Sequence, residues 1–185
     1  MSYIVTPIVI DLDALRSRLQ AHDLTLLAGI ERDAKQIDRD LDDDGPTTLE
    51  HARRIVMGEA TDEWPNAKYG YGLQLICEHL GDFQQNDHWS AMSSSWFTQV
   101  DAALKEAGCP FSLVAKLFYS GPPTKIPRPD DFPGMGHLDP DQVAGLCESL
   151  QQALPALPAQ EKKSVAQAVR WLDAARGVGI VTFYS

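Results

Sequence analysis

The sequence lacks most of the features that identify a secreted or membrane protein. Its three cysteines, Cys77, Cys109 and Cys147, are odd in number and widely spaced, which excludes a disulfide framework and a CxxC metal site. No apolar run approaches the roughly 20 residues that a membrane helix needs. The first residues, MSYIVTPIVIDLDAL, lack the basic segment and the cleavage site of a signal peptide. We therefore expect a cytoplasmic protein that does not act on membranes.

Known catalytic and cofactor-binding motifs are missing as well. GMGHLD at 134–139 has neither the GxGxxG nor the P-loop pattern, and neither HExxH nor GxSxG occurs. The acidic run DRDLDDDG at 38–45 differs from a calcium loop, because Asp43 stands where glycine is needed and Leu49 where glutamate is needed. We therefore expect no cofactor and no metal ion.

Basic residues are scarce in the first half of the chain. Residues 1–93 contain 17 Asp and Glu against 8 Lys and Arg, whereas residues 94–185 contain 9 against 8. Such an acidic half disfavours binding to nucleic acid and anionic membranes. It favours a basic protein partner, with Asp42, Asp43 and Asp44 in the densest acidic stretch, 31–63, as candidate contacts. The alternative is that the charge serves only solubility.

The periodic segments predict a single α+β domain over residues 1–185, mostly helical, in which the terminal strands share a small sheet. Strands are expected at about 3–9 and 178–184, with at least five helices between them. The run 111–121 is ambiguous between strand and helix, and its length favours a short helix. The expected core residues are Trp96, Val100, Leu104, Val143, Leu146, Leu150, Val169 and Leu172.

Residues 121–137, GPPTKIPRPDDFPGMGH, are expected to form an extended strap without regular structure. Five prolines in this stretch fix φ and remove N–H donors. The strap either packs onto the core through Ile126, Phe132 and Met135 or has a function, and the sequence leaves both open. If it binds a partner, Ile126, Arg128 and Phe132 are the candidate contacts.

The stretch YGYGLQLICEHLGDFQQNDHWS at 69–90 concentrates residues that can bind metals. On a helix, successive residues project about 100° apart, so Cys77, Glu78 and His79 cannot converge on one ion. Cys77 falls on the apolar stripe and is expected to be buried. Tyr69 and Trp89, together with Tyr71, are expected to anchor the helix ends with their polar tips at the surface.

Two histidines are weak candidates for catalysis. His137 lies in the strap near Asp130 and Asp131 and is the best lone candidate for a general base, with His79 as a second.

Four strings carry a resemblance to a known family: DLDAL at 11–15, KYGYGLQLICEHLG at 68–81 with the following Trp89, PDDFPGMGHLDPDQV at 129–143, and GIVTFYS at 179–185. They resemble an uncharacterised family of small bacterial cytoplasmic proteins, a domain of unknown function. The chain is also distantly similar to YfbM-like proteins, which share the order of strand first and strand last. The resemblance implies no activity and no catalytic residues. Proteins of this sort are similar to small acidic proteins found near secreted bacterial toxins, where they serve as immunity partners.

These observations favour a non-enzymatic protein-binding protein, in particular an immunity-type partner of a basic bacterial toxin. The alternative is a small hydrolase or transferase with an unrecognised site near His137, His79 and the strap.

Overall fold

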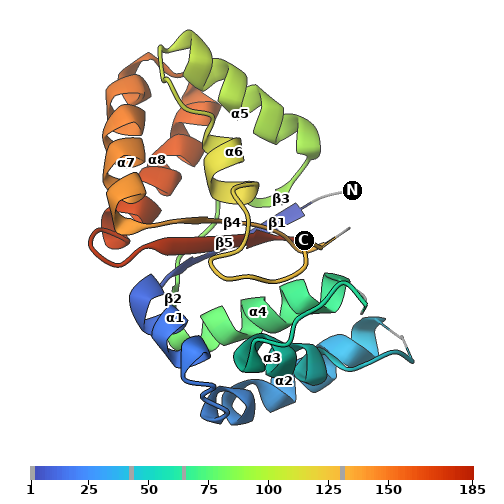
Figure 1. Cartoon of the computed structure of the whole chain (residues 1–185). Helices are drawn as coiled ribbons and strands as arrows, with labels where there is room; N and C mark the ends of the chain where they lie inside the picture. Colours follow the sequence, from blue (N-terminus) through green and yellow to red (C-terminus); the bar gives the residue numbers. More distant parts are fainter. Residues whose placement is uncertain (1–2, 42–43, 64–65, 130–131) are drawn as a thin grey trace.

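The computed structural model describes residues 3–41, 44–63, 66–129 and 132–185, and in it a small antiparallel sheet separates two layers of helices (Figure 1). The elements are, in chain order, β1 (Tyr3–Val9), α1 (Leu12–Gln20), α2 (Thr25–Leu41), α3 (Thr48–Met57), α4 (Asn66–Leu80), β2 (Asp82–Phe83), β3 (Ser90–Met92), α5 (Ser94–Glu106), α6 (Leu113–Phe118), β4 (Gly134–Leu138), α7 (Pro140–Ala153), a short 3-10 turn (Leu154–Ala156), α8 (Ala159–Ala174) and β5 (Ile180–Tyr184). The predicted α+β class is confirmed. None of the helices in the described ranges combines the length and the hydropathy needed to cross a membrane.

The two terminal strands pair with each other, as predicted. β1 and β5 run antiparallel, with Val5 opposite Tyr184 and Val9 opposite Ile180. β4 pairs with the other side of β5, while β3 and β2 pair with the two ends of β1. Pro7 lies between the parts of β1 that pair with β3 and β2, where the ladder needs no N–H donor.

One strand contradicts the sequence prediction. Residues 121–137 were expected to lack regular structure, but Gly134–Leu138 form β4 and pair with β5. The prolines of the strap end at Pro133, so every N–H from Gly134 to Leu138 is available for hydrogen bonding. β4 therefore begins directly after the last of these prolines.

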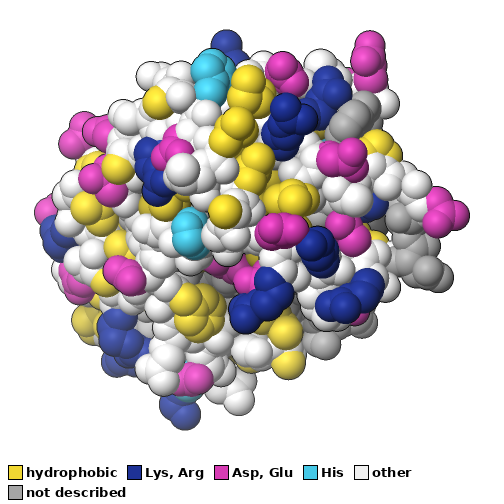
Figure 2. Space-filling model, turned by 90° about the horizontal axis from the view of Figure 1, so that it is seen from below, with side chains coloured by type: hydrophobic (Ala, Val, Ile, Leu, Met, Phe, Trp, Pro, Cys, Tyr) yellow, Lys and Arg dark blue, Asp and Glu magenta, His cyan; other side chains and the backbone are white. Residues whose placement is uncertain are grey.

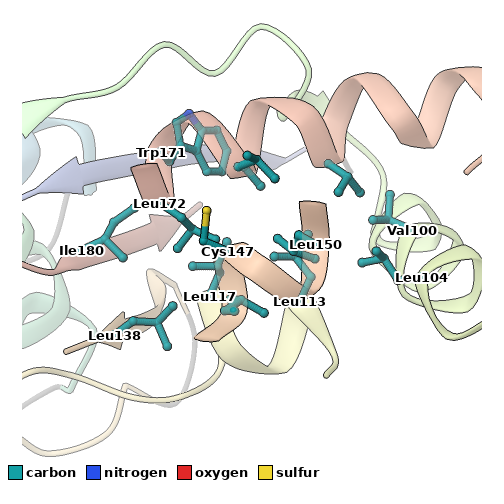
Figure 3. Packing of buried hydrophobic residues seen from close by; sticks show 14 of the residues in the cluster. Val100, Leu104, Leu113, Leu117, Leu138, Cys147, Leu150, Trp171, Leu172 and Ile180 are labelled. Atoms are coloured by element: carbon teal, nitrogen blue, oxygen red, sulfur yellow. The ribbon is translucent and has the colours of Figure 1, made fainter. Parts of the chain in front are cut away.

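The upper layer in Figure 1 consists of α5 to α8 and has its own core against the sheet. Figure 3 shows side chains from α5, α6, α7, α8, β4 and β5 pointing into one interior. Seven of the expected core residues are buried there: Val100, Leu104, Val143, Leu146, Leu150, Val169 and Leu172. The eighth, Trp96, is half-buried and packs against this core.

The lower layer consists of α1 to α4 and packs a second core against the opposite face of the sheet (Figure 1). Helices α3 and α4 approach closely at Gly72, where a Cβ would lie 3.1 Å from the backbone nitrogen of Ala52.

The expectation that Tyr69 and Trp89 keep their polar tips at the surface is wrong, since both are fully buried. The Tyr69 hydroxyl accepts a hydrogen bond from the Thr61 N–H at 3.2 Å, and the Trp89 indole N–H donates to the Ser164 carbonyl at 2.8 Å. Internal partners thus replace water at both polar groups.

Candidate binding groove

An open groove of about 1080 Å³ lies between α5, α6, the strap and one end of the sheet. Seven aromatic side chains line it: Tyr3, Phe97, Phe111, Phe118, Tyr119, Phe132 and Tyr184. We call this feature the aromatic groove. Its lining comes from both chain ends and from the middle of the sequence, so it exists only in the folded protein.

Tyr184, the last residue of β5, is the centre of the aromatic groove. Its ring centroid lies 5.4 Å from that of Tyr119, 5.8 Å from Phe132 and 6.1 Å from Tyr3. The ring lies over Gly134, the residue opposite it on β4, where a Cβ would be only 2.0 Å from Tyr184 Cε1. Gly134 therefore makes the space in which the aromatic rings meet.

Helices α5 and α6 form one wall. Ser94, Thr98, Asp101 and Lys105 of α5 face the groove at spacings of four, three and four residues, which places them on one helix face. The carboxylate of Asp101 fixes α6, because it accepts hydrogen bonds from the Ser112 hydroxyl and from the Val114 N–H. The N-cap of α6 is Ser112, whose hydroxyl accepts a hydrogen bond from the Ala115 N–H at 2.8 Å, and this cap explains why the ambiguous run 111–121 contains a helix.

The strap forms the opposite wall and is fixed to the lower layer. Arg16 of α1 donates hydrogen bonds to the Pro123 carbonyl at 3.2 Å and to the Asp139 carboxylate at 2.8 Å. Farther along, Pro133 packs so tightly on α4 that a Cβ at Gly70 would lie 2.8 Å from its Cδ. The strap is thus anchored at two points on either side of Arg128.

The structure separates the three strap residues that the sequence suggested as partner contacts. Arg128 and Phe132 both line the aromatic groove. Ile126 is half-buried and packs instead against the lower core.

The polar groups of the groove are mainly donors and cations. Lys105 and Arg128 are exposed, and neither forms an ion pair with a described residue. Burial raises the pKa of Tyr184 above its usual value, and the hydrogen bond to Tyr119 and the nearby Tyr3 raise it further, whereas Arg128 lowers it. Tyr184 is therefore a neutral phenol at physiological pH and can share in hydrogen bonds as a donor.

The two candidate histidines lie in different surroundings. The Nδ1 of His137 donates to the Gly121 carbonyl at 2.9 Å, at the start of the strap. His79 is exposed on α4 and packs over Gly29 of α2, where a Cβ would lie 2.3 Å from its ring. The hydroxyl nearest to His137, that of Ser120, bonds the backbone N–H and carbonyl of His137, each at 2.8 Å. Both His137 and Ser120 thus hold the strap to β4.

The residues 77–79 diverge as predicted. Cys77 is fully buried in the lower core, where burial raises the pKa of its thiol, while Glu78 and His79 are exposed. Within the described ranges, no three His, Cys, Asp or Glu side chains come close enough together to hold a metal ion.

Only one of the three acidic candidates lies among the described residues. Asp44 is exposed between α2 and α3, and Asp42 and Asp43 lie outside the described residues. Figure 2 views the lower layer from below and shows Lys and Arg mixed with Asp and Glu. On α2, for example, Lys35 pairs with Glu31 at 2.6 Å. The described part of this face is therefore of mixed charge.

Sequence reasoning missed most of the groove. Tyr3, Tyr119, Tyr184 and Lys105 were not singled out, because no local pattern connects them. The one usable signal was the pairing of the terminal strands, which places Tyr3 and Tyr184 at the same end of the sheet.

Comparison with known proteins gives a family but no activity. A family model described as a domain of unknown function, DUF7691, matches residues 1–185. No curated protein and no solved structure matches the chain. The chain thus belongs, over its whole length, to the DUF7691 family of domains of unknown function.

Proposed function

We propose that this chain is a non-enzymatic protein-binding protein that holds a segment of its partner in the aromatic groove. The observation that carries the proposal is that seven aromatic side chains line one open groove with anchored walls. Aromatic side chains dominate the binding energy of protein interfaces, because they bury a large area and lose little conformational freedom. Tyr119 is 51% exposed and Phe111, also in the groove, is 38% exposed, so both present surface to a partner.

The enzymatic alternative has no comparable support. A hydrolase that acts through a serine nucleophile needs that hydroxyl within hydrogen-bonding reach of its base. The side-chain hydrogen bonds of His137 and Ser120 go instead to backbone groups of the strap and of β4. We therefore advance binding rather than catalysis.

The finer proposal is an immunity-type partner of a basic toxin in the bacterial cytoplasm. It is supported by the net charge of −9 that the composition gives residues 1–93. A surface of this sign raises the association rate of a basic partner, even when it contributes little to final affinity. The bacterial origin and the relation to YfbM-like proteins belong to the same proposal.

The test is affinity capture followed by reconstitution with the purified partner. We expect the wild-type chain to form a stoichiometric complex by size-exclusion chromatography with light scattering. The double variant Phe111→Ser, Tyr119→Ser should bind about tenfold more weakly or worse, since both residues are exposed interface aromatics. The matched control is Phe83→Ser in β2, which pairs with the end of β1 away from Tyr3 and whose side chain is 58% exposed. Equal binding by the groove variant and the control, or no partner that forms a complex, would contradict the proposal.

A further inference from the structure

We infer that the segment bound in the aromatic groove is an extended acidic peptide, with an aromatic anchor residue flanked by carboxylate side chains. The inference rests on the proposed protein-binding function and names the chemistry of the occupant.

The charges at the groove are the first argument. Lys105 on the α5 wall and Arg128 on the strap wall have no ion-pair partner among the described residues. The carboxylate of Asp101, which lines the same groove, already accepts from Ser112 through one oxygen and from Val114 through the other. A purely apolar occupant would remove water from two cations without replacing its hydrogen bonds, which is unfavourable. Carboxylates on the occupant would pair with both cations.

The hydroxyl groups are the second argument. Tyr3, Tyr119 and Tyr184 bring three phenols to the groove. Phenols beside a guanidinium form a set of donors that suits an anionic acceptor. The groove can therefore bind carboxylates through these phenols as well as through Lys105 and Arg128.

The geometry of the rings around Tyr184 favours an aromatic anchor residue in the bound peptide. The rings around Tyr184 meet it mostly edge to face, at interplanar angles of 69° for Tyr119, 78° for Tyr3 and 86° for Phe132. An added aromatic ring extends such a cluster in the geometry that aromatic pairs prefer. An aliphatic anchor would bury apolar area but would form none of these edge-to-face ring contacts.

The length of the groove favours an extended chain. Its α5 wall runs from Ser94 to Lys105, which is about 16 Å at the helical rise per residue. This distance corresponds to about five residues of extended peptide. An anchor residue and acidic residues one or two positions away on each side fit within that span.

The experiment selects peptides without assuming a partner. A displayed library of random dodecapeptides is selected on the full-length wild-type protein and counter-selected on the variant Phe111→Ser, Tyr119→Ser. We expect groove-dependent peptides to share an aromatic residue with Asp or Glu within two positions. Synthetic versions in which Glu is replaced by Gln should bind about tenfold more weakly, and the affinity of the acidic peptides should fall with added salt.

A charge swap sharpens the result. The double variant Lys105→Glu, Arg128→Glu should bind the acidic peptides with about tenfold lower affinity. It should regain affinity for versions of these peptides that have Lys in place of Glu. The control Lys125→Glu, Lys163→Glu makes the same change of charge at two exposed residues that do not line the groove. A further variant, Asp130→Asn, Asp131→Asn, removes the two acids that follow Arg128 closely in the sequence and should bind the acidic peptides at least as tightly.

The outcomes separate this inference from the proposed function. Groove-dependent peptides that are neutral or basic would overturn the inference and leave protein binding by the groove in place. If the control Lys125→Glu, Lys163→Glu weakens binding of the acidic peptides as much as Lys105→Glu, Arg128→Glu does, the inference also fails. The loss of affinity would then result from the change in net charge. An absence of any groove-dependent peptide would overturn the inference and remove the groove from the proposed function.

Discussion

The two helical layers of this protein use their polar and aromatic residues differently. In the lower layer, the buried Lys68 donates to the Pro46 carbonyl at 3.0 Å and lies 3.9 Å from the Asp38 carboxylate, so its charge is compensated inside the layer. In the upper layer, Lys105, together with Arg128 of the strap, is left without an ion pair among the described residues, beside open aromatic rings. The acidic half of the sequence supplies the lower layer, whereas most residues that line the aromatic groove come from the second half. A binding role must therefore be tested separately on each.

The largest expected effect distinguishes the two cores. Trp89 is fully buried, and its ring lies 5.8 Å from Phe97 and 5.5 Å from Phe118, which line the groove. Trp89→Ala should destabilise the fold by about 3–5 kcal/mol and weaken groove binding as well. Leu73→Ala, in the lower core, should cost about 2–5 kcal/mol but leave binding by the folded fraction intact. Urea unfolding measures the stability of both variants, and peptide affinity at low urea measures binding by the folded protein. Equal loss of binding in the two variants would contradict the separation of the layers.

Two glycine substitutions give a matched pair of smaller effects. Gly134→Ala should displace the Tyr184 ring, cost about 1–3 kcal/mol and abolish groove binding, because the new Cβ meets that ring at 2.0 Å. Gly29→Ala also meets a ring, that of His79 at 2.3 Å, but this imidazole is exposed and can turn away. Since alanine is the better helix former by about 1 kcal/mol, Gly29→Ala should be neutral or stabilising. Thermal melts of both variants decide the point, and a stable Gly134→Ala that still binds would show that the close approach is not needed.

A feature of this structure could be predicted from the sequence only where residues close together in the chain determine it. Periodicity predicted the helices, and α7 begins with a capping box, in which the Asp139 N–H donates to the Gln142 side chain at 3.1 Å. β4 was missed because its pairing depends on β5, which is distant in the sequence. The groove was missed for the same reason: Gly134 matters only because Tyr184 lies over it. Contacts of this kind leave no periodic signal in the sequence.

The strap joins the two layers through Arg16, and its release should be measurable. Arg16→Met removes the hydrogen bonds to Pro123 and Asp139 and should cost about 1 kcal/mol, since the side chain is partly exposed to solvent. Amide hydrogen exchange within 121–129 should become faster. Arg18→Met is the control, because Arg18 bonds Asp23 and Thr25 of its own layer. If exchange in the strap is the same in both variants, Arg16 does not anchor it.

The raised pKa of Tyr184 predicts how stability changes at high pH. The folded protein holds the phenol proton more tightly than the unfolded chain, whose tyrosines have a pKa near 10. The resulting stabilisation is fully present below pH 10 and is lost as the pH rises above it. Absorbance at 295 nm should show a late-titrating tyrosine component, and Tyr184→Phe should remove it. A late part of the folded-state titration curve that Tyr184→Phe leaves unchanged would contradict a raised pKa at Tyr184.

The smallest expected effect concerns the acidic run at 42–44. Asp42, Asp43 and Asp44 follow α2 in the sequence, and carboxylates after the C-terminal end of a helix oppose its dipole, so their replacement by Asn removes an unfavourable interaction. The variant should therefore melt at least as high as the wild type. With a basic partner it should associate more slowly, and its rate should depend less on salt. An association rate that is indifferent both to salt and to the triple change would show that the acidic surface serves solubility alone.

Site-specific photo-crosslinking addresses the aromatic groove most directly, since it works before the partner has been identified. A photoreactive phenylalanine analogue is placed at Phe111, in the groove, and in separate proteins at Phe83 and at Asp44, both exposed and outside it. If the groove holds the partner, irradiation in cell extract should give a discrete crosslinked protein from position 111, and this product should disappear in the presence of Gly134→Ala. A discrete product from position 44 or 83 with none from position 111 would contradict binding in the aromatic groove.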